Sequence, residues 1–269
     1  MTVSEVLAAA IRDFAAHGFD SEQRLNDWLA RLRDAIAASV RPAPAMEQAM
    51  RDALSTIFRR LVDKRQVLKV HPGVDRFTLD RIAPRLRLEL ERRMLASSQL
   101  IKLNRAEMID KTLRRFSGWA SSVPAGGSDT VDKRDVKDDV YKPLASLPFV
   151  ERRLLTDQGH KLNASISAVL AHDSNAIAAQ WYSRWRSLNY NYRPDHKERD
   201  GNVYLIRDTW AVRAGLVKVG PAGWSDDITQ PAQEIYCRCH FIWLYSLRQL
   251  PDDMTTQKGK DAMAEARVA

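Results

Sequence analysis

The chain is poor in cysteine: only Cys237 and Cys239 occur in 269 residues. One residue separates them, and the short ring that a disulfide would close between them strains the bond geometry. We therefore expect reduced thiols or a metal site, and synthesis in the cytosol. No apolar run approaches the roughly 20 residues that span a bilayer. Residues 1–5 lack the basic and apolar regions of a secretory signal, so we expect neither a signal nor a membrane contact.

The sequence also lacks the common catalytic motifs. It contains no G-x-S-x-G, no phosphate-cradling glycine loop and no H-E-x-x-H. Two enzymatic alternatives remain: a cysteine–histidine nucleophile pair, and a metal-dependent nuclease that uses His196, Asp200 and the two thiols. We expect no catalytic residues and a protein that acts by binding.

What the sequence does have is positive charge. The net charge is +8 and the isoelectric point about 9.6, within an ordinary globular composition of 45% hydrophobic and 28% charged residues. Such a surface favours an acidic partner, either nucleic acid or protein. The candidates for contact with DNA or a partner lie in an arginine-rich helical region: Arg85, Arg92, Arg93, Arg105, Arg114 and Arg115. The alternative is a solvated helix face with many ion pairs, which makes no contact with DNA.

The hydrophobic pattern predicts a mainly α fold with a small α+β module near the C-terminus. Residues 1–117 form a helical domain, 118–148 a linker or arm rich in glycine, serine and proline, 149–250 the module, and 251–269 a polar tail. Local signals mark the first helices, because Thr2 and Glu5 fit a capping box, Gly18 fits a helix end and Ser21 fits a second cap. A further helix begins near residue 78, and we expect a break near Ser97 and Ser98.

Within the module, residues 149–188 are predicted to be helical. Three strands follow, at 202–207, 210–219 and 239–247, where β-branched and aromatic residues gather. The helix and the short strands would carry the residues with the most distinctive chemistry.

Those residues lie between Arg193 and His240. Thiolates and imidazoles bind zinc. The candidate zinc ligands are therefore His196, Cys237, Cys239 and His240, with Asp195 or Asp200 as alternatives to His240 in the fourth position. The alternative is structural: the thiols pack as small apolar groups and His196 bonds a backbone carbonyl. Zinc is therefore the one cofactor that the sequence suggests.

Three separated motifs carry a family resemblance. Arg193-Pro-Asp-His196-x-x-x-Asp200-Gly201 is followed by Tyr236-Cys237-Arg238-Cys239, and a helix with Asp157-Gln158-x-x-Lys161-Leu-Asn lies upstream, with Trp181 or Trp185 before the histidine motif. Over residues 150–247 this order resembles the phage head morphogenesis family, the minor head proteins of the Mu F type. The chain departs from the family in having Gln233-Glu234-Ile235-Tyr236 where members often have His-Pro-x-Asn, which removes one potential metal ligand.

The resemblance implies a non-enzymatic virion component of a tailed bacteriophage. Such a protein is made in the host cytoplasm, lies inside the capsid near the portal, and assists head assembly, genome packaging or ejection. Its partners would be the portal protein, other head proteins and packaged DNA, with residues 1–117 docking on the portal. The motif residues would then stabilise the module: Arg193, His196, Asp200, Gly201, Cys237, Arg238, Cys239, Asp157 and Gln158.

Overall fold

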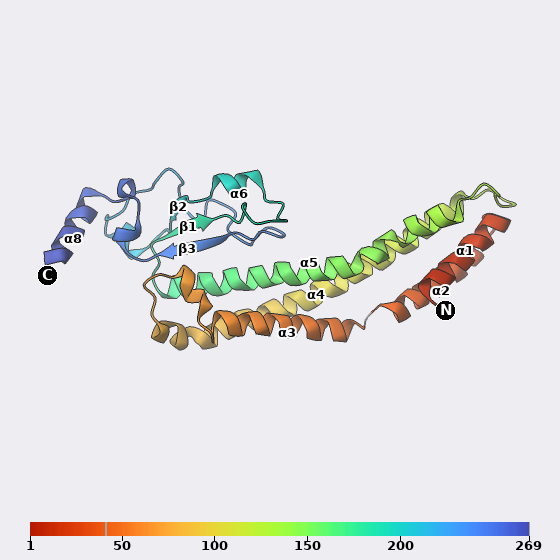
Figure 1. The fold of residues 1–269 in the computed structure, drawn as a ribbon, viewed down its shortest axis with the longest axis horizontal. Helices are drawn as coiled ribbons and strands as arrows, with labels where there is room; N and C mark the ends of the chain where they lie inside the picture. The colour runs from red at the N-terminus through yellow and green to blue at the C-terminus, as the bar shows by residue number, and fades with distance from the viewer. Residues whose placement is uncertain (41, 269) are drawn as a thin grey trace. The chain divides into compact units, whose positions relative to one another are not determined.

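The chain folds into two compact units (Figure 1). The computed structural model describes residues 1–40 and 42–268. Unit 1 comprises Met1–Met50 and Ala96–Leu154, and unit 2 comprises Arg51–Leu95 and the chain from Leu155 onward. The expected fold class is confirmed, because the chain is mainly helical with one small antiparallel sheet near the C-terminus.

Unit 1 begins with two helices whose ends follow the local sequence signals. In α1 (Val3–His17) the Thr2 and Glu5 capping box is present, and the chain leaves the helix at Gly18 with φ of 72°. Ser21 caps α2 (Glu22–Ser39) by accepting the backbone N–H of Arg24. These two helices lie side by side in Figure 1. Their apolar faces bury a core with the unit 1 parts of two long helices, centred on Phe14 and Phe116.

Three helices contribute residues to both units: α3 (Ala43–Leu61), α4 (Arg76–Ser122) and α5 (Lys133–Asp173). The expected break near Ser97 and Ser98 is absent, because α4 continues through both residues. Ser97 is fully buried, which is why two serines do not interrupt the helix as they would on a solvated face.

The linker expected at 118–148 is largely wrong. Helix α4 extends to Ser122 and α5 starts at Lys133, so only the ten residues between them are non-helical. Pro143 and Pro148 lie inside α5. The neighbouring apolar residues Val140, Leu144 and Leu147 are buried in the unit 1 core, and this burial outweighs the cost of proline within a helix.

Unit 2 contains the sheet, whose strand order is β2-β1-β3. Strand β1 (Ala178–Tyr182) lies in the centre and pairs antiparallel with β2 (Val203–Leu205) and β3 (His240–Leu244), so that Ala178 faces both Leu205 and Leu244. The short elements of the unit are η1 (Gln66–Val70), α6 (Pro194–Glu198), α7 (Trp210–Arg213), η2 (Leu247–Gln249), η3 (Asp252–Met254) and α8 (Gln257–Val268).

The structure corrects three expectations in unit 2. Residues 178–182 are a strand and not the end of a helix, because pairing on both edges overrides the helical pattern. The strand expected at 210–219 is the short helix α7, capped by Thr209, followed by a single bridge at Val217. The tail expected to be loose carries η3 and α8, and its Met254 is buried in the core of the unit. Over the described part of the chain, no helix has the length and apolar content to cross a bilayer.

Candidate metal centre

Helix α6 places His196 over the sheet. Arg193 precedes the helix in an extended conformation and Pro194 fills its first position, where a missing N–H has no cost. Gly201 then turns the chain into β2 with φ of 84°, and its N–H donates to the carbonyl of Trp181. Helix α6 and this turn together hold the His196 imidazole against the central strand β1. The Trp181 indole packs edge-on against the imidazole, with 5.2 Å between the ring centroids.

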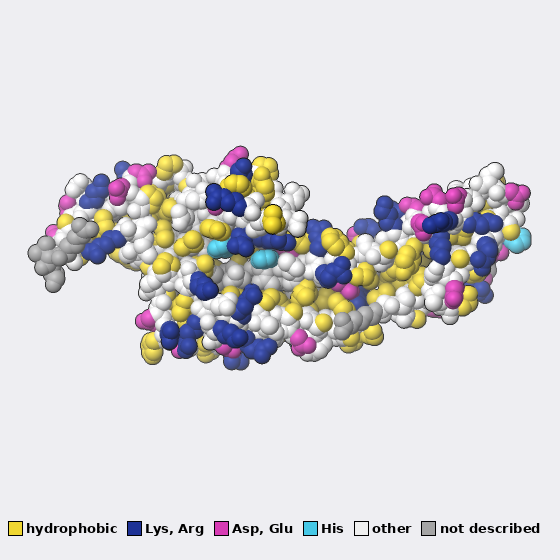
Figure 2. Space-filling view, in the orientation of Figure 1, with side chains coloured by type: hydrophobic (Ala, Val, Ile, Leu, Met, Phe, Trp, Pro, Cys, Tyr) yellow, Lys and Arg dark blue, Asp and Glu magenta, His cyan; other side chains and the backbone are white. Residues whose placement is uncertain are grey.

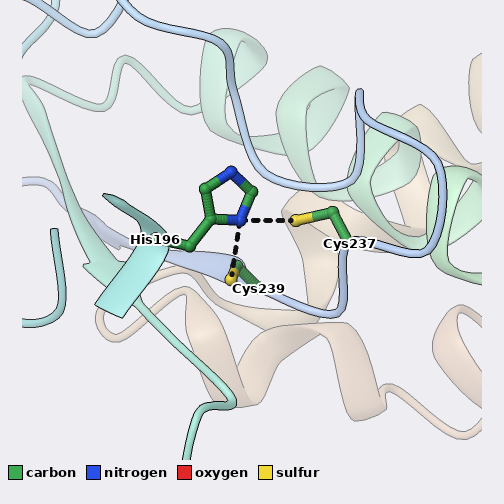
Figure 3. Close-up of side chains that lie close together, drawn as sticks. All are labelled: His196, Cys237 and Cys239. Atoms are coloured by element: carbon green, nitrogen blue, oxygen red, sulfur yellow. Dashed lines mark hydrogen bonds between the residues drawn. The ribbon is translucent and has the colours of Figure 1, made fainter. Parts of the chain in front are cut away.

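The two cysteines approach the same imidazole from the segment before β3 (Figure 3). The Nδ1 atom of His196 lies 3.6 Å from Sγ of Cys237 and 3.7 Å from Sγ of Cys239. All three side chains are buried, with exposures of 1%, 0% and 4%. Their candidate ligand atoms lie within 4.8 Å of one another. This buried group could hold a metal ion.

The donor set and spacing fit a zinc ion. Zinc binds thiolate sulfur at about 2.3 Å and imidazole nitrogen at about 2.0–2.1 Å, so a tetrahedral ion places its nitrogen and sulfur ligands roughly 3.5–3.6 Å apart. The observed separations of 3.6 and 3.7 Å are close to that value. Three protein ligands leave the fourth position of a tetrahedral ion to a water molecule or another group.

His240 does not join this group among the described residues. It follows Cys239 directly, and successive side chains of a strand point to opposite faces. The His240 ring instead packs on Tyr182 of the paired strand, at 4.7 Å between centroids. Three of the four predicted zinc ligands therefore come together, and the fourth, His240, lies outside the group.

A carboxylate lies on the far side of the His196 ring. Oε2 of Glu234 is 3.0 Å from Nε2, and the same oxygen is 3.0 Å from Nε of Arg193. Histidine that binds a metal through one nitrogen commonly has a carboxylate at the other, which fixes the ring and raises its basicity. From the sequence, the segment with Glu234 was expected only to lack a metal ligand that family members often have there. Its position three residues before Cys237 gave a signal for this role, but only the fold shows which nitrogen it meets.

The proton distribution between the thiols is uneven. A hydrogen bond from Cys237 lowers the pKa of Cys239 to about 6, against the effect of burial. The same hydrogen bond, together with burial, raises the pKa of Cys237. Cys239 is thus the thiolate of the pair near neutral pH, and a thiolate is the form that ligates metals.

Asp200 has a structural role. Its carboxylate accepts the Ser183 backbone N–H at 2.7 Å and the Trp185 indole N–H at 2.9 Å. Both oxygens are therefore engaged in holding the segment after β1, and Asp200 lies outside the metal-binding group.

The upstream motif reaches the cysteine segment directly. Asp157 of α5 accepts the backbone N–H of Tyr236 at 2.8 Å, where the chain takes a left-handed conformation with φ of 65°. Lys161 and Gln158 lie 3.0 and 3.1 Å from the other Asp157 oxygen. The 5% exposed carboxylate thus holds the turn that delivers Cys237.

Most of the arginines proposed for nucleic-acid contact have carboxylate partners. A carboxylate oxygen lies within 2.8 Å of Arg85, Arg92, Arg105, Arg114 and Arg115. Arg93 bonds Gln158 and Ser165. The six are divided between the two units. This arrangement favours the alternative that the sequence left open, a helix surface with many ion pairs.

Comparison of the chain with protein-family models, with curated proteins and with solved structures found no match.

Proposed function

We propose that this chain is a minor head protein of a tailed bacteriophage, acting by binding during head assembly, genome packaging or ejection. The proposal rests on the resemblance of residues 150–247 to the head morphogenesis family. One structural observation supports it: the three motifs of that resemblance, far apart in sequence, make direct contacts inside unit 2. Asp157 holds the turn at Tyr236, and His196 meets Cys237 and Cys239.

The same contacts support a structural role for the motif residues. The three side chains of the metal-binding group are at most 4% exposed, which limits access of a substrate to any ion there. A nuclease at this place would use Asp200 beside His196, yet both Asp200 oxygens accept hydrogen bonds from the segment after β1. These features favour a scaffold over a reaction centre.

The metal in this proposal is zinc. His196, Cys237 and Cys239 would hold it and Glu234 would orient the imidazole from behind. A bound zinc ion supplies folding energy by cross-linking α6 to the segment before β3. In this proposal the helices of residues 1–117, which contribute residues to both units, dock on the portal protein.

Location in the particle tests the function. Virions of the phage that encodes the chain are purified, opened in steps and analysed by mass spectrometry, with affinity capture of the portal protein from assembling heads. We expect the protein in the head fraction, in low copy number and captured with the portal. Heads that assemble, fill and eject normally without this protein would overturn the proposal, as would its absence from particles.

Residues of the metal group separate scaffold from direct contact. His196→Ala should lower the melting temperature and head assembly together, whereas His172→Ala, an exposed histidine in α5 of the same unit, should change neither. Assembly that fails while the melting temperature stays normal would contradict the scaffold role and point to direct contact through His196.

A further inference from the structure

Unit 2 contains a cavity of about 570 Å³ beside β3. Residues from the end of α3, η1, α5 and β3 line it, together with residues 184, 187, 230, 231, 238 and 239. Its volume lies within the roughly 300–1,000 Å³ of small-molecule sites. On the face in Figure 2, cyan histidine side chains lie beside dark-blue Lys and Arg side chains in the part of unit 2 where α5 and β3 lie.

The charge of this cavity is of one sign. No aspartate or glutamate is among its lining residues, whereas six basic or imidazole side chains are: Arg60, Lys69, His160, Arg184, Arg238 and His240. They come from five separate segments of the chain, so no single stretch of the sequence reveals them. Cations gathered in this way repel one another, and an anion between them would relieve that repulsion.

Elsewhere in the same unit, arginines are neutralised. Arg81 and Arg85 pair with Asp173, and Arg207 pairs with Asp226 and Asp227. By contrast, within the described residues no carboxylate lies at ion-pair distance from the four cations of the cavity: Arg60, Lys69, Arg184 and Arg238. Nε of Arg238 is buried and has no hydrogen-bond partner among the described residues. A buried guanidinium nitrogen without an acceptor is costly, so a ligand oxygen there would satisfy it.

The pKa of His160 also reflects the positive charge of this cavity. Burial lowers the pKa of His160, and the nearby cations Arg238, Arg184 and Arg60 lower it further, against a smaller opposing effect of Asp157. The His160 ring is therefore neutral at pH 7, and it can still donate one N–H to an anion.

Apolar side chains form another part of the lining. Leu61, Val67, Phe241 and Trp243 contribute, and the Trp243 indole N–H is already satisfied by Ser167 at 2.8 Å. A small inorganic anion would leave this apolar surface against water. A ligand that combines phosphate groups with a flat apolar ring would cover both parts.

We propose that this cavity binds a nucleotide, with its phosphates between Arg60, Arg184 and Arg238 and its base towards the aromatic side chains of β3. Free nucleotides and the nucleotides of a single DNA strand share this chemistry. The proposal does not depend on the role in the phage head. Of the metal-binding group only Cys239 lines the cavity, and the three arginines that would hold the phosphates lie outside that group.

Binding by the full-length protein tests the site. Isothermal titration calorimetry at low salt is performed with pyrophosphate and with deoxyadenosine triphosphate. A fluorescent single-stranded oligonucleotide of about 12 nucleotides is followed by anisotropy, with the triphosphate as competitor. The variant Arg60→Gln/Arg184→Gln removes two positive charges from the lining of the cavity. The control Arg213→Gln removes an exposed charge of the same unit outside the cavity.

We expect saturable binding that the double variant weakens at least about tenfold, since each lost charge-assisted hydrogen bond costs roughly that factor. The control should change it by less than about twofold. Competition between triphosphate and oligonucleotide would assign the site to a DNA strand, and triphosphate binding alone would assign it to a free nucleotide. Absence of saturable binding to all three probes, or equal weakening by the control, would overturn the proposal. Unchanged melting temperatures ensure that the variants are folded.

Discussion

The sharpest test of the metal group is His196→Ala measured with and without a chelator. The side chain is 1% exposed and packs against Trp181, so its truncation leaves a cavity even in metal-free protein. Large-to-small changes of this kind cost about 2–4 kcal/mol of the free energy of unfolding. This loss belongs to packing alone and should appear under both conditions.

The metal adds a second contribution that only the unmodified protein should show. A ligand at a thousand times its dissociation constant stabilises the folded state by about 4 kcal/mol. Chelation should therefore lower the free energy of unfolding of the unmodified protein by about 4 kcal/mol, or its melting temperature by roughly 8–16 °C for a domain of this size. In His196→Ala the chelator should change the free energy by less than about 1 kcal/mol, because two thiolates alone bind zinc weakly.

Urea titrations followed by tryptophan fluorescence give both quantities. His172→Ala serves as the matched control and should keep the full response to the chelator. A chelator that leaves the unmodified protein unchanged would refute the metal. A response of equal size in His196→Ala would show that the ion lies elsewhere.

Three further predictions concern stability. Asp200→Ala should cost about 1–3 kcal/mol, because two part-buried donors lose their acceptor. Gly201→Ala should cost only about 1–2 kcal/mol of the free energy of unfolding, since the φ of Gly201 is positive but its surroundings are open. Gly18→Ala should cost more, because a Cβ at that position would lie 1.8 Å from the Pro124 carbonyl oxygen. Burial lowers the pKa of His71 from 6.5 to about 3, so its contribution to stability is complete above pH 6.5 and should fall by about 2 kcal/mol by pH 5.

The same urea titrations measure these effects. For the aspartate, a loss below about 0.5 kcal/mol would contradict the role assigned to its hydrogen bonds. For the glycines, equal losses at the two positions would contradict the steric account of the difference between them. For the histidine, the difference between pH 7 and pH 5 should shrink by about 2 kcal/mol in His71→Gln. An unchanged pH dependence in that variant would assign the effect to other groups.

Local signals made parts of the fold predictable. The cap at Thr2 and the helix end at Gly18 depend on hydrogen bonds and backbone angles within a few residues, and both were correctly expected. Strand β1 could not be predicted in this way. Its residues Ala178–Tyr182 continue a helical pattern, and they form a strand because β2 and β3, distant in sequence, pair with both edges.

The candidate site was predictable to the same degree. The scarcity of cysteine and the nearby His196 pointed to the group that the structure brings together. Adjacency in sequence misled at His240, since neighbouring strand residues face opposite ways. Two residues could not be recognised from the sequence, because separate segments bring them to their sites in unit 2: Glu234 beside the imidazole and Arg60 in the cavity.

Elemental analysis of the natively purified protein tests the central claim most directly. The account predicts about one zinc ion per chain, lost from Cys237→Ser/Cys239→Ser and retained in His172→Ala. Protein that is folded and free of zinc, or a double variant that keeps its zinc, would contradict it.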